Sequence, residues 1–233
     1  MLPSPQFLAA NIAAVRERVA GAARAAGRAP ESVTIIGVTK THPAEIVTAA
    51  RAAGLTDIGE NYLQEALSKI EAVGRDGLVW HFIGQLQSNK TRPVAESFDW
   101  VHTVDRLKLA ERLSVQRPFH GPPLQVCLQV KLAEEPGKGG ATPEELPALA
   151  RAVAALPKLK LRGLMCVPPE SPDAHEQRRW FGQARGLLED LRRDGLPVDV
   201  LSMGMSGDLE SAIMEGATHV RIGTALFGTR SRP

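Results

Sequence analysis

Cysteine is scarce in this sequence, with two such residues among 233. Cys127 and Cys166 both lie inside short apolar runs that are typical of strands, where a free thiol packs like a small hydrophobic side chain. Two cysteines in a chain of this length do not provide the dense cross-linking of a small secreted domain. The scarcity argues against a disulfide framework and favours a reducing compartment.

An excess of charge of one sign is also absent. The 28 lysines and arginines nearly balance the 26 acidic residues, the formal net charge is +2, and no long block of one sign occurs. A surface that binds nucleic acid is therefore not expected. We expect no metal site either.

A secretory leader and long hydrophobic runs are missing as well. The first residues, MLPSPQFLAANIAAVRERV, lack the basic start and the apolar run of a signal peptide. No stretch approaches the length of a membrane-spanning helix. We therefore expect no association with a membrane and a cytoplasmic location.

Internal repeats, low-complexity tracts and interdomain linkers do not stand out either. A chain of 233 residues with 43% hydrophobic side chains is long enough for one large domain with a full core. The prediction is one domain over residues 1–233, with a leading helix in 1–30 and a barrel in 31–230. Apolar residues at helical spacing within 5–26, followed by Gly27, indicate the leading helix.

Short apolar runs alternate with longer helical patterns from residue 33 onward. The expected strands are 33–40, 56–60, 78–84, 100–104, 124–132, 159–167, 198–203 and 219–227. The expected helices are 43–53, 62–73, 88–96, 106–115, one beginning near 143, 174–194 and 208–215. This strict alternation is typical of a parallel (β/α)8 TIM barrel, with an open doubly wound sheet as the alternative.

The first expected strand ends on a lysine. The β-branched run 33–38 leads to Lys40, and Pro43 is suited to the first position of a helix. Ligands collect at the carboxyl ends of parallel strands. In a partly dry pocket there, the pKa of Lys40 would fall and its neutral amine could form an imine with a carbonyl. The alternative is a strand-end lysine that reaches water.

Two further strand ends present polar side chains. Asn61 could donate or accept a hydrogen bond with a ligand, and with Gln64 it also forms a plausible helix-capping pair. His81, between Trp80 and Phe82, is expected to be a hydrogen-bonded core residue, with a place beside a ligand ring as the alternative.

The last two strand ends indicate a phosphate site. The segment 201–208, LSMGMSGD, combines glycines and serines just before a helix, so backbone N–H groups and Ser206 could contact an anion. The alternative is a turn in which Ser206 caps the helix. Gly223 and Thr224 could donate to the same phosphate, because loops after strands seven and eight form the usual phosphate site of this barrel.

Arg221 is the one arginine in the apolar run 220–227. An unpaired guanidinium there would be costly, so we expect a carboxylate or a ligand acceptor as its partner. An imine-forming lysine, a phosphate site and this arginine together specify pyridoxal 5′-phosphate (PLP) better than any one of them does.

Several longer motifs resemble one known family over nearly the whole chain. They are VTKTHP (38–43), GENYLQEALSKI (59–70), WHFIGQLQSNK (80–90), HTVDR (102–106), LRGLMCVPP (161–169), LSMGMSGDLESAI (201–213) and VRIGTALFG (220–228). The chain thus resembles the pyridoxal phosphate homeostasis protein family, whose fold is similar to the amino-terminal barrel of alanine racemase. Gln85 and Gly139, at positions where family members often have proline and serine, depart from its pattern.

The resemblance implies a role for each candidate site residue. It implies that Lys40 forms the internal aldimine with PLP. The implied phosphate ligands are Ser206, Gly223 and Thr224. Arg221 would face the pyridine nitrogen, Asn61 would lie near the cofactor, and Ser202 and Met203 would line the pocket. The loop at Lys138 carries the family's Lys-x-Gly pattern, with no role assigned.

The family implies PLP homeostasis: reversible binding of PLP, a low level of free PLP, and PLP-dependent apoenzymes as candidate recipients. Arginine only donates hydrogen bonds, so facing the pyridine nitrogen it would disfavour the protonated ring that catalysis exploits. Alanine racemases also use a tyrosine from another domain, whereas Tyr62 is the only tyrosine here. We therefore expect a monomeric binding protein without catalytic residues. A PLP-dependent amino-acid racemase and a Schiff-base aldolase are the alternatives.

Overall fold

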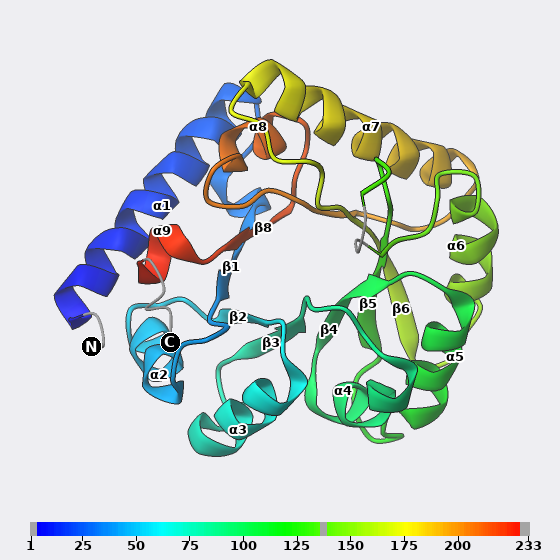
Figure 1. The fold of residues 1–233 in the computed structure, drawn as a ribbon, viewed down its shortest axis with the longest axis horizontal. Coiled ribbons are helices and arrows are strands. Elements are labelled where there is room, and N and C mark those ends of the chain that lie inside the picture. The colour runs from blue at the N-terminus through cyan, green and yellow to red at the C-terminus, as the bar shows by residue number, and fades with distance from the viewer. Residues whose placement is uncertain (1–3, 136–138, 229–233) are drawn as a thin grey trace.

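The computed structural model of the protein describes residues 4–135 and 139–228. Within these ranges, eight parallel strands close into a barrel in chain order, with β1 hydrogen-bonded to both β2 and β8 (Figure 1). The strands are β1 (Thr34–Val38), β2 (Asp57–Glu60), β3 (Val79–Phe82), β4 (Trp100–Val104), β5 (Leu124–Gln129), β6 (Leu159–Met165), β7 (Val200–Ser202) and β8 (His219–Ile222). The predicted (β/α)8 barrel is confirmed, and the open doubly wound sheet is wrong.

Helices surround the barrel and connect its strands (Figure 1). The α-helices are α1 (Pro5–Ala25), α2 (Ala44–Ala52), α3 (Leu63–Val73), α4 (Thr91–Ser97), α5 (Leu107–Gln116), α6 (Leu146–Ala154), α7 (Ala174–Arg193), α8 (Leu209–Met214) and α9 (Thr224–Phe227). Two single 3-10 turns, η1 (Pro30–Ser32) and η2 (Ser88–Lys90), precede β1 and α4. In the described ranges, no helix combines the length and the apolar character needed to cross a bilayer.

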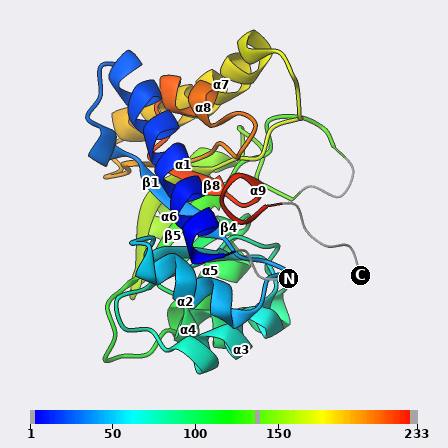
Figure 2. The same cartoon turned by 90° about the vertical axis from the view of Figure 1, so that its left-hand side faces the viewer.

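The leading helix α1 precedes the first strand, as predicted. It lies on the outside of the barrel beside α8 and α9 (Figures 1 and 2). Its apolar side, which includes Leu8, Ile12 and Val15, is buried against this layer. Gly27 follows the helix with a φ of 69°, a left-handed conformation that glycine adopts without a Cβ clash.

The structure departs from the prediction most clearly at the end of the barrel. A strand over 219–227 was expected, but β8 ends at Ile222 and the short helix α9 follows. Asn11 of α1 donates a hydrogen bond from Nδ2 to the carbonyl oxygen of Leu226 at 2.9 Å. A short apolar run fits a buried strand or a buried helix equally well, so this contact between distant segments decides the outcome.

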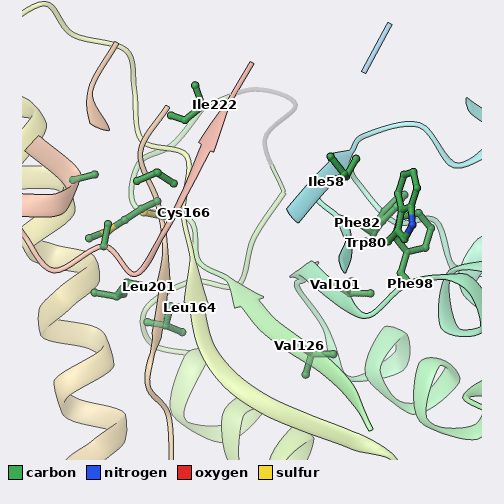
Figure 3. Close-up of a cluster of buried hydrophobic side chains, with 14 of the residues drawn as sticks. Ile58, Trp80, Phe82, Phe98, Val101, Val126, Leu164, Cys166, Leu201 and Ile222 are labelled. Atoms are coloured by element: carbon green, nitrogen blue, oxygen red, sulfur yellow. The ribbon is translucent and has the colours of Figure 1, made fainter. Parts of the chain in front are cut away.

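Buried side chains fall into two compartments on the two faces of the barrel wall. The outer core, between strands and helices, is a large hydrophobic cluster that includes Trp80, Phe82 and Phe98, which lie close together in Figure 3. The barrel interior is lined by a second hydrophobic cluster and by buried histidines. Its members include Trp100, Cys127, Met165, Val200, His81, His102 and His219. Ring contacts between β8 and strands β3 and β4 span this interior, because these strands are not neighbours in the sheet.

Candidate functional site

A cavity of about 890 Å³ lies at the carboxyl ends of the strands. Residues just after β1, β2, β3, β6, β7 and β8 line it, as expected for the functional end of such a barrel. Six of the eight residues predicted to contact a cofactor are among the lining residues: Lys40, Asn61, Ser206, Arg221, Gly223 and Thr224. The topology therefore gathers side chains from distant parts of the chain around one space.

Lys40 reaches this cavity because of its position relative to β1. Side chains alternate between the faces of a strand, so Ile36 and Val38 share the inward face. Lys40 follows two residues after Val38, and both line the cavity. The strand ends at Val38, two residues before the predicted end. Thr41 then adopts a φ of 66°, a strained conformation for a β-branched residue that costs on the order of 1–3 kcal/mol.

Backbone groups on both sides of Lys40 are held by charged side chains. The carbonyl oxygen of Thr39 accepts a hydrogen bond from Lys69 Nζ at 2.7 Å, and the Thr41 N–H donates to Glu65 Oε1 at 2.6 Å. Lys69 is buried on α3 and also contacts Glu65 at 2.6 Å. This arrangement stabilises the strained turn and fixes the backbone from which the Lys40 side chain projects.

Glu60 is the buried carboxylate that balances Lys69. One carboxylate oxygen, Oε1, lies 2.6 Å from Lys69 Nζ and also accepts a hydrogen bond from the Thr39 hydroxyl. The other oxygen, Oε2, is buried without a hydrogen-bond partner among the described residues. Burial raises the pKa of Glu60, and the charge of Lys69 opposes this effect. The buried pair of Lys69 and Glu60 therefore lies against Thr39, the residue before Lys40.

Asn61 follows β2 and faces the same cavity. Its Oδ1 is buried and has no hydrogen-bond partner among the described residues. The alternative that Asn61 caps the next helix is wrong, because Tyr62 holds the capping position of α3 and no side chain bonds there. Gly84 packs tightly on the Asn61 backbone, since a Cβ at position 84 would lie 1.9 Å from the Asn61 carbonyl oxygen. An unpartnered buried acceptor beside a cavity is what a ligand donor would satisfy.

The loop after β7 supplies Ser206. Gly204 begins the turn with a φ of 95°, and a Cβ there would lie 2.6 Å from the Ala212 side chain, so glycine is required. Ser206 does not cap α8, which was the alternative. Its hydroxyl oxygen accepts a hydrogen bond from the Ala225 N–H at 3.3 Å, which links the loops after β7 and β8.

Asp208 closes the same loop and lines the cavity. Its Oδ1 accepts a hydrogen bond from the Met205 N–H at 2.6 Å. Burial raises the pKa of Asp208, while this hydrogen bond and the charge of Arg221 lower it by less. A carboxyl group in this position holds the turn and also places an acid within the cavity.

Arg221 points inward from β8 and is buried. Its Nη1 donates to Ser202 Oγ and its Nη2 donates to the Cys166 carbonyl oxygen, each at 2.9 Å. Both acceptors are uncharged, so the described residues do not provide the carboxylate partner that was one expected alternative. Burial lowers the pKa of Arg221 from its ordinary value. A guanidinium held on neutral oxygens retains an electrostatic attraction for an anionic or acceptor group in the cavity.

Two predicted residues lie outside the cavity wall. Ser202 and Met203 are fully buried and are not among the lining residues. Ser202 Oγ instead accepts a hydrogen bond from Arg221, whereas Met203 belongs to the outer core. The predicted Lys138 loop centre lies outside the described residues, although its neighbour Gly139 is described.

The prediction missed several cavity residues from the loop after β6. They are Glu170, Ser171 and Pro172, and Gln177 joins them from the start of α7. Ser171 Oγ donates to Glu176 Oε2 at 2.7 Å, which fastens this loop to α7. The sequence signal was available, because this loop follows the sixth strand and strand-end loops form the functional face. Met205 and Gly207 were within the predicted phosphate loop but were not singled out.

The donor set fits a cofactor that carries an aldehyde, an anion and a ring acceptor. Lys40 offers an amine, Arg221 a guanidinium, and Ser206 and Thr224 offer hydroxyls, while Asn61 has an unsatisfied acceptor. In the part of the chain that the structure describes, no group of histidine, cysteine or acidic residues is arranged to hold a metal ion.

Comparisons with known proteins agree with this arrangement. A family model described as "Alanine racemase, N-terminal domain" matches residues 8–231. Proteins named pyridoxal phosphate homeostasis protein from Pseudomonas aeruginosa and Escherichia coli are 58% and 49% identical to this chain over 223 and 230 residues. Each match covers 96% of this chain, and they cover 96% and 97% of the respective relatives.

Solved structures show the same similarity. PipY of Synechococcus elongatus, solved with PLP bound, has a TM-score of 0.84 and 39% sequence identity, with 95% of this chain and 100% of that chain covered. Alanine racemase from Corynebacterium glutamicum has a TM-score of 0.73 at 17% identity, with 97% of this chain and 62% of that chain covered, so it shares the fold. The chain belongs to the pyridoxal phosphate homeostasis protein family, which shares the amino-terminal barrel of alanine racemase.

Proposed function

We propose that this protein binds PLP and holds it by a reversible covalent bond to Lys40. The observation that carries the proposal is the convergence of Lys40, Arg221 and the Ser206 loop on one cavity. PLP supplies a reactive aldehyde when bound. The neutral amine of Lys40 adds to the aldehyde carbon, and the carbonyl oxygen leaves as water while a carbon–nitrogen double bond forms.

The remaining cavity residues would bind and orient the cofactor. Ser206, Gly223 and Thr224 hold the phosphate through hydroxyl and backbone N–H donors, at the usual phosphate position of this barrel. Arg221 faces the ring nitrogen, and Asn61 lies beside the ring with its free acceptor. Because Arg221 donates and does not accept, the ring nitrogen stays unprotonated and the bound cofactor is a weaker electron sink.

This arrangement favours storage of PLP over catalysis. Racemisation needs a second acid or base on the opposite face of the substrate carbon. Tyr62 does not line the cavity, and 56% of its surface is exposed to solvent at the start of α3. The cavity acid Asp208 is engaged by the Met205 N–H and holds the loop after β7. The protein would therefore limit free PLP and supply apoenzymes, acting as a cytoplasmic monomer in which residues 1–233 form one PLP-binding domain. Purified protein with PLP should leave the optical activity of L-alanine unchanged.

An absorption titration with PLP tests the proposal. After PLP is added and unbound PLP, which also absorbs at the edge of the visible range, is removed by gel filtration, wild-type protein should keep a visible band and Lys40→Ala should not. Lys108→Ala, which removes an exposed lysine on the outer helix α5, is the matched control and should behave like wild type. A colourless wild-type protein, or a band that survives in Lys40→Ala, would contradict the proposal.

A further inference from the structure

A line of hydrogen-bonded side chains crosses the barrel interior, starting at Arg221. Arg221 Nη1 donates to Ser202 Oγ at 2.9 Å, and Ser202 Oγ lies 2.8 Å from His102 Nδ1. His102 Nε2 lies 2.9 Å from His81 Nδ1, and His81 Nε2 lies 3.0 Å from Asp57 Oδ1. We call these five residues the interior chain.

The interior chain connects the cavity to the opposite end of the barrel. Ser202 ends β7 and His102 lies in β4, and because these strands are not neighbours, their contact spans the interior. Asp57 is the first residue of β2, at the end of the barrel remote from the cavity, and 24% of its side chain is exposed. Ser202, His102 and His81 are fully buried between these two ends.

The two ends of the interior chain fix the direction of its hydrogen bonds. A guanidinium only donates and a carboxylate only accepts, so the protons point from Arg221 towards Asp57. The Ser202 hydroxyl then donates to His102 Nδ1, His102 Nε2–H donates to His81 Nδ1, and His81 Nε2–H donates to Asp57. Both histidines are therefore neutral and carry their proton on Nε2.

The opposite arrangement leaves a polar group unsatisfied. If His102 carried its proton on Nδ1, it would donate to Ser202, and the Ser202 hydroxyl proton would face only donors among its described contacts. His81 would then also have to carry two protons, as a buried cation. Burial strongly lowers the pKa of His102, and the charge of Arg221 acts in the same direction. The neutral arrangement satisfies every link.

We propose that Ser202, His102, His81 and Asp57 are positioning residues that hold the Arg221 guanidinium in the orientation in which it meets the ring of PLP. Ser202 contacts Arg221 directly, and the other three fix the Ser202 hydroxyl proton so that its oxygen accepts from Arg221. The proposal rests on the proposed function, because it concerns the same site. It adds a hydrogen-bonded series of residues that holds Arg221 in place and reaches from Ser202 to Asp57 at the opposite end of the barrel.

Nitrogen NMR of the PLP-free wild-type protein tests the chain without any cofactor. With ¹⁵N-labelled histidine, both ring nitrogens of His102 and His81 should show the pattern of a neutral imidazole protonated on Nε2. A proton on His102 Nδ1, or a doubly protonated His81, would overturn the assignment of direction and with it the proposal. This result is independent of whether the protein binds PLP.

A double-mutant cycle on PLP affinity tests the positioning role. Ser202→Ala and His102→Leu should each weaken PLP binding about tenfold, the loss expected for one hydrogen bond to a charged group. Because both act through one link to Arg221, the double variant should also be weaker by about tenfold and not by about a hundredfold. Independent effects that multiply would overturn the proposal.

His219→Leu is the matched control for this cycle. His219 lies in the same histidine cluster and contacts the His102 ring at 6.2 Å between centroids. Its hydrogen bond goes to Thr218 Oγ1, outside the interior chain. It should therefore leave PLP affinity within about twofold of wild type, and a loss equal to that of His102→Leu would show a general packing effect and overturn the positioning role. If wild-type protein failed to bind PLP, the proposed function would fail while the NMR result still decided the geometry of the chain.

Discussion

The two faces of the barrel wall differ in chemistry although the same strands build both. On β3, Trp80 and Phe82 point outward into the outer core, while His81 between them points into the interior. On β8, Val220 and Ile222 belong to the outer core, while Arg221 points inward. The outer face attaches helices through hydrophobic packing, and the inner face carries hydrogen-bonded groups that lead to the cavity.

This difference separates the source of stability from the source of function. In the outer core, one apolar side chain can replace another of similar volume, because hydrophobic burial is not directional. Interior polar groups cannot be exchanged in this way, because each buried donor must point at its own acceptor. Substitutions on the two faces should therefore have different signatures, and the following experiments compare them.

The largest effect is expected in the outer core. Phe98 is fully buried and meets Phe82 edge-on at 5.3 Å between ring centroids. Phe98→Ala should lower the free energy of unfolding by about 3–5 kcal/mol, because it removes buried surface and leaves a cavity. Phe119, which is 86% exposed, is the matched control, and Phe119→Ala should change the value by less than about 0.5 kcal/mol. Urea unfolding measures both, and equal losses would contradict the assignment of the outer core.

An intermediate effect is expected from the interior histidines as the pH falls. Burial lowers the pKa of His219 to about 3. The unfolded chain gains a proton near pH 6.5 while the folded chain does not, so stability is present above about pH 6.5 and is lost as the pH falls towards about 3. The expected loss is about 1.4 kcal/mol per pH unit for each such histidine.

Urea unfolding between about pH 6.5 and about pH 5 measures this slope. His219→Leu should make the slope shallower by about 1.4 kcal/mol per pH unit, whatever its effect on stability at neutral pH. Phe98→Ala should lower stability without changing the slope. An unchanged slope in His219→Leu would contradict the account of a dry interior.

The smallest difference between the two compartments is expected in the reactivity of the two cysteine thiols, since each compartment holds one of them. Cys166 belongs to the outer core and Cys127 to the interior. Burial raises the pKa of each to about 12, so neither forms a thiolate near neutral pH. A thiol-specific reagent should react with neither cysteine in the native protein and with both in denaturant. Reaction of Cys127 alone in the native protein would show that water reaches the interior.

Much of the fold could be predicted from the sequence because strands and helices have local patterns. The run 100–104 was predicted as a strand and forms β4 with the same bounds. The expected strand over 219–227 was wrong after Ile222, because contacts of α9 with α1 decide a short apolar run that has no clear period of its own. The prediction of His81 as a hydrogen-bonded core residue is confirmed.

The site residues could be predicted where they follow the end of a strand or belong to a recognisable motif. Lys40, Asn61 and Arg221 were singled out from their positions, and the structure places them on one cavity, while their roles towards PLP stay predictions. The interior chain could not be predicted, because His102 and Ser202 are 100 residues apart and no spacing reveals which side chains meet across a barrel. That pairing depends on barrel closure and on the tilt of its strands.

The most direct test of the central claim is to locate the covalent bond. Wild-type protein loaded with PLP is reduced with borohydride, digested, and analysed by peptide mass. The account predicts that the reduced adduct of PLP lies on the peptide that contains Lys40 and is missing in Lys40→Ala. An adduct on another lysine, or no adduct in a protein that binds PLP, would contradict it.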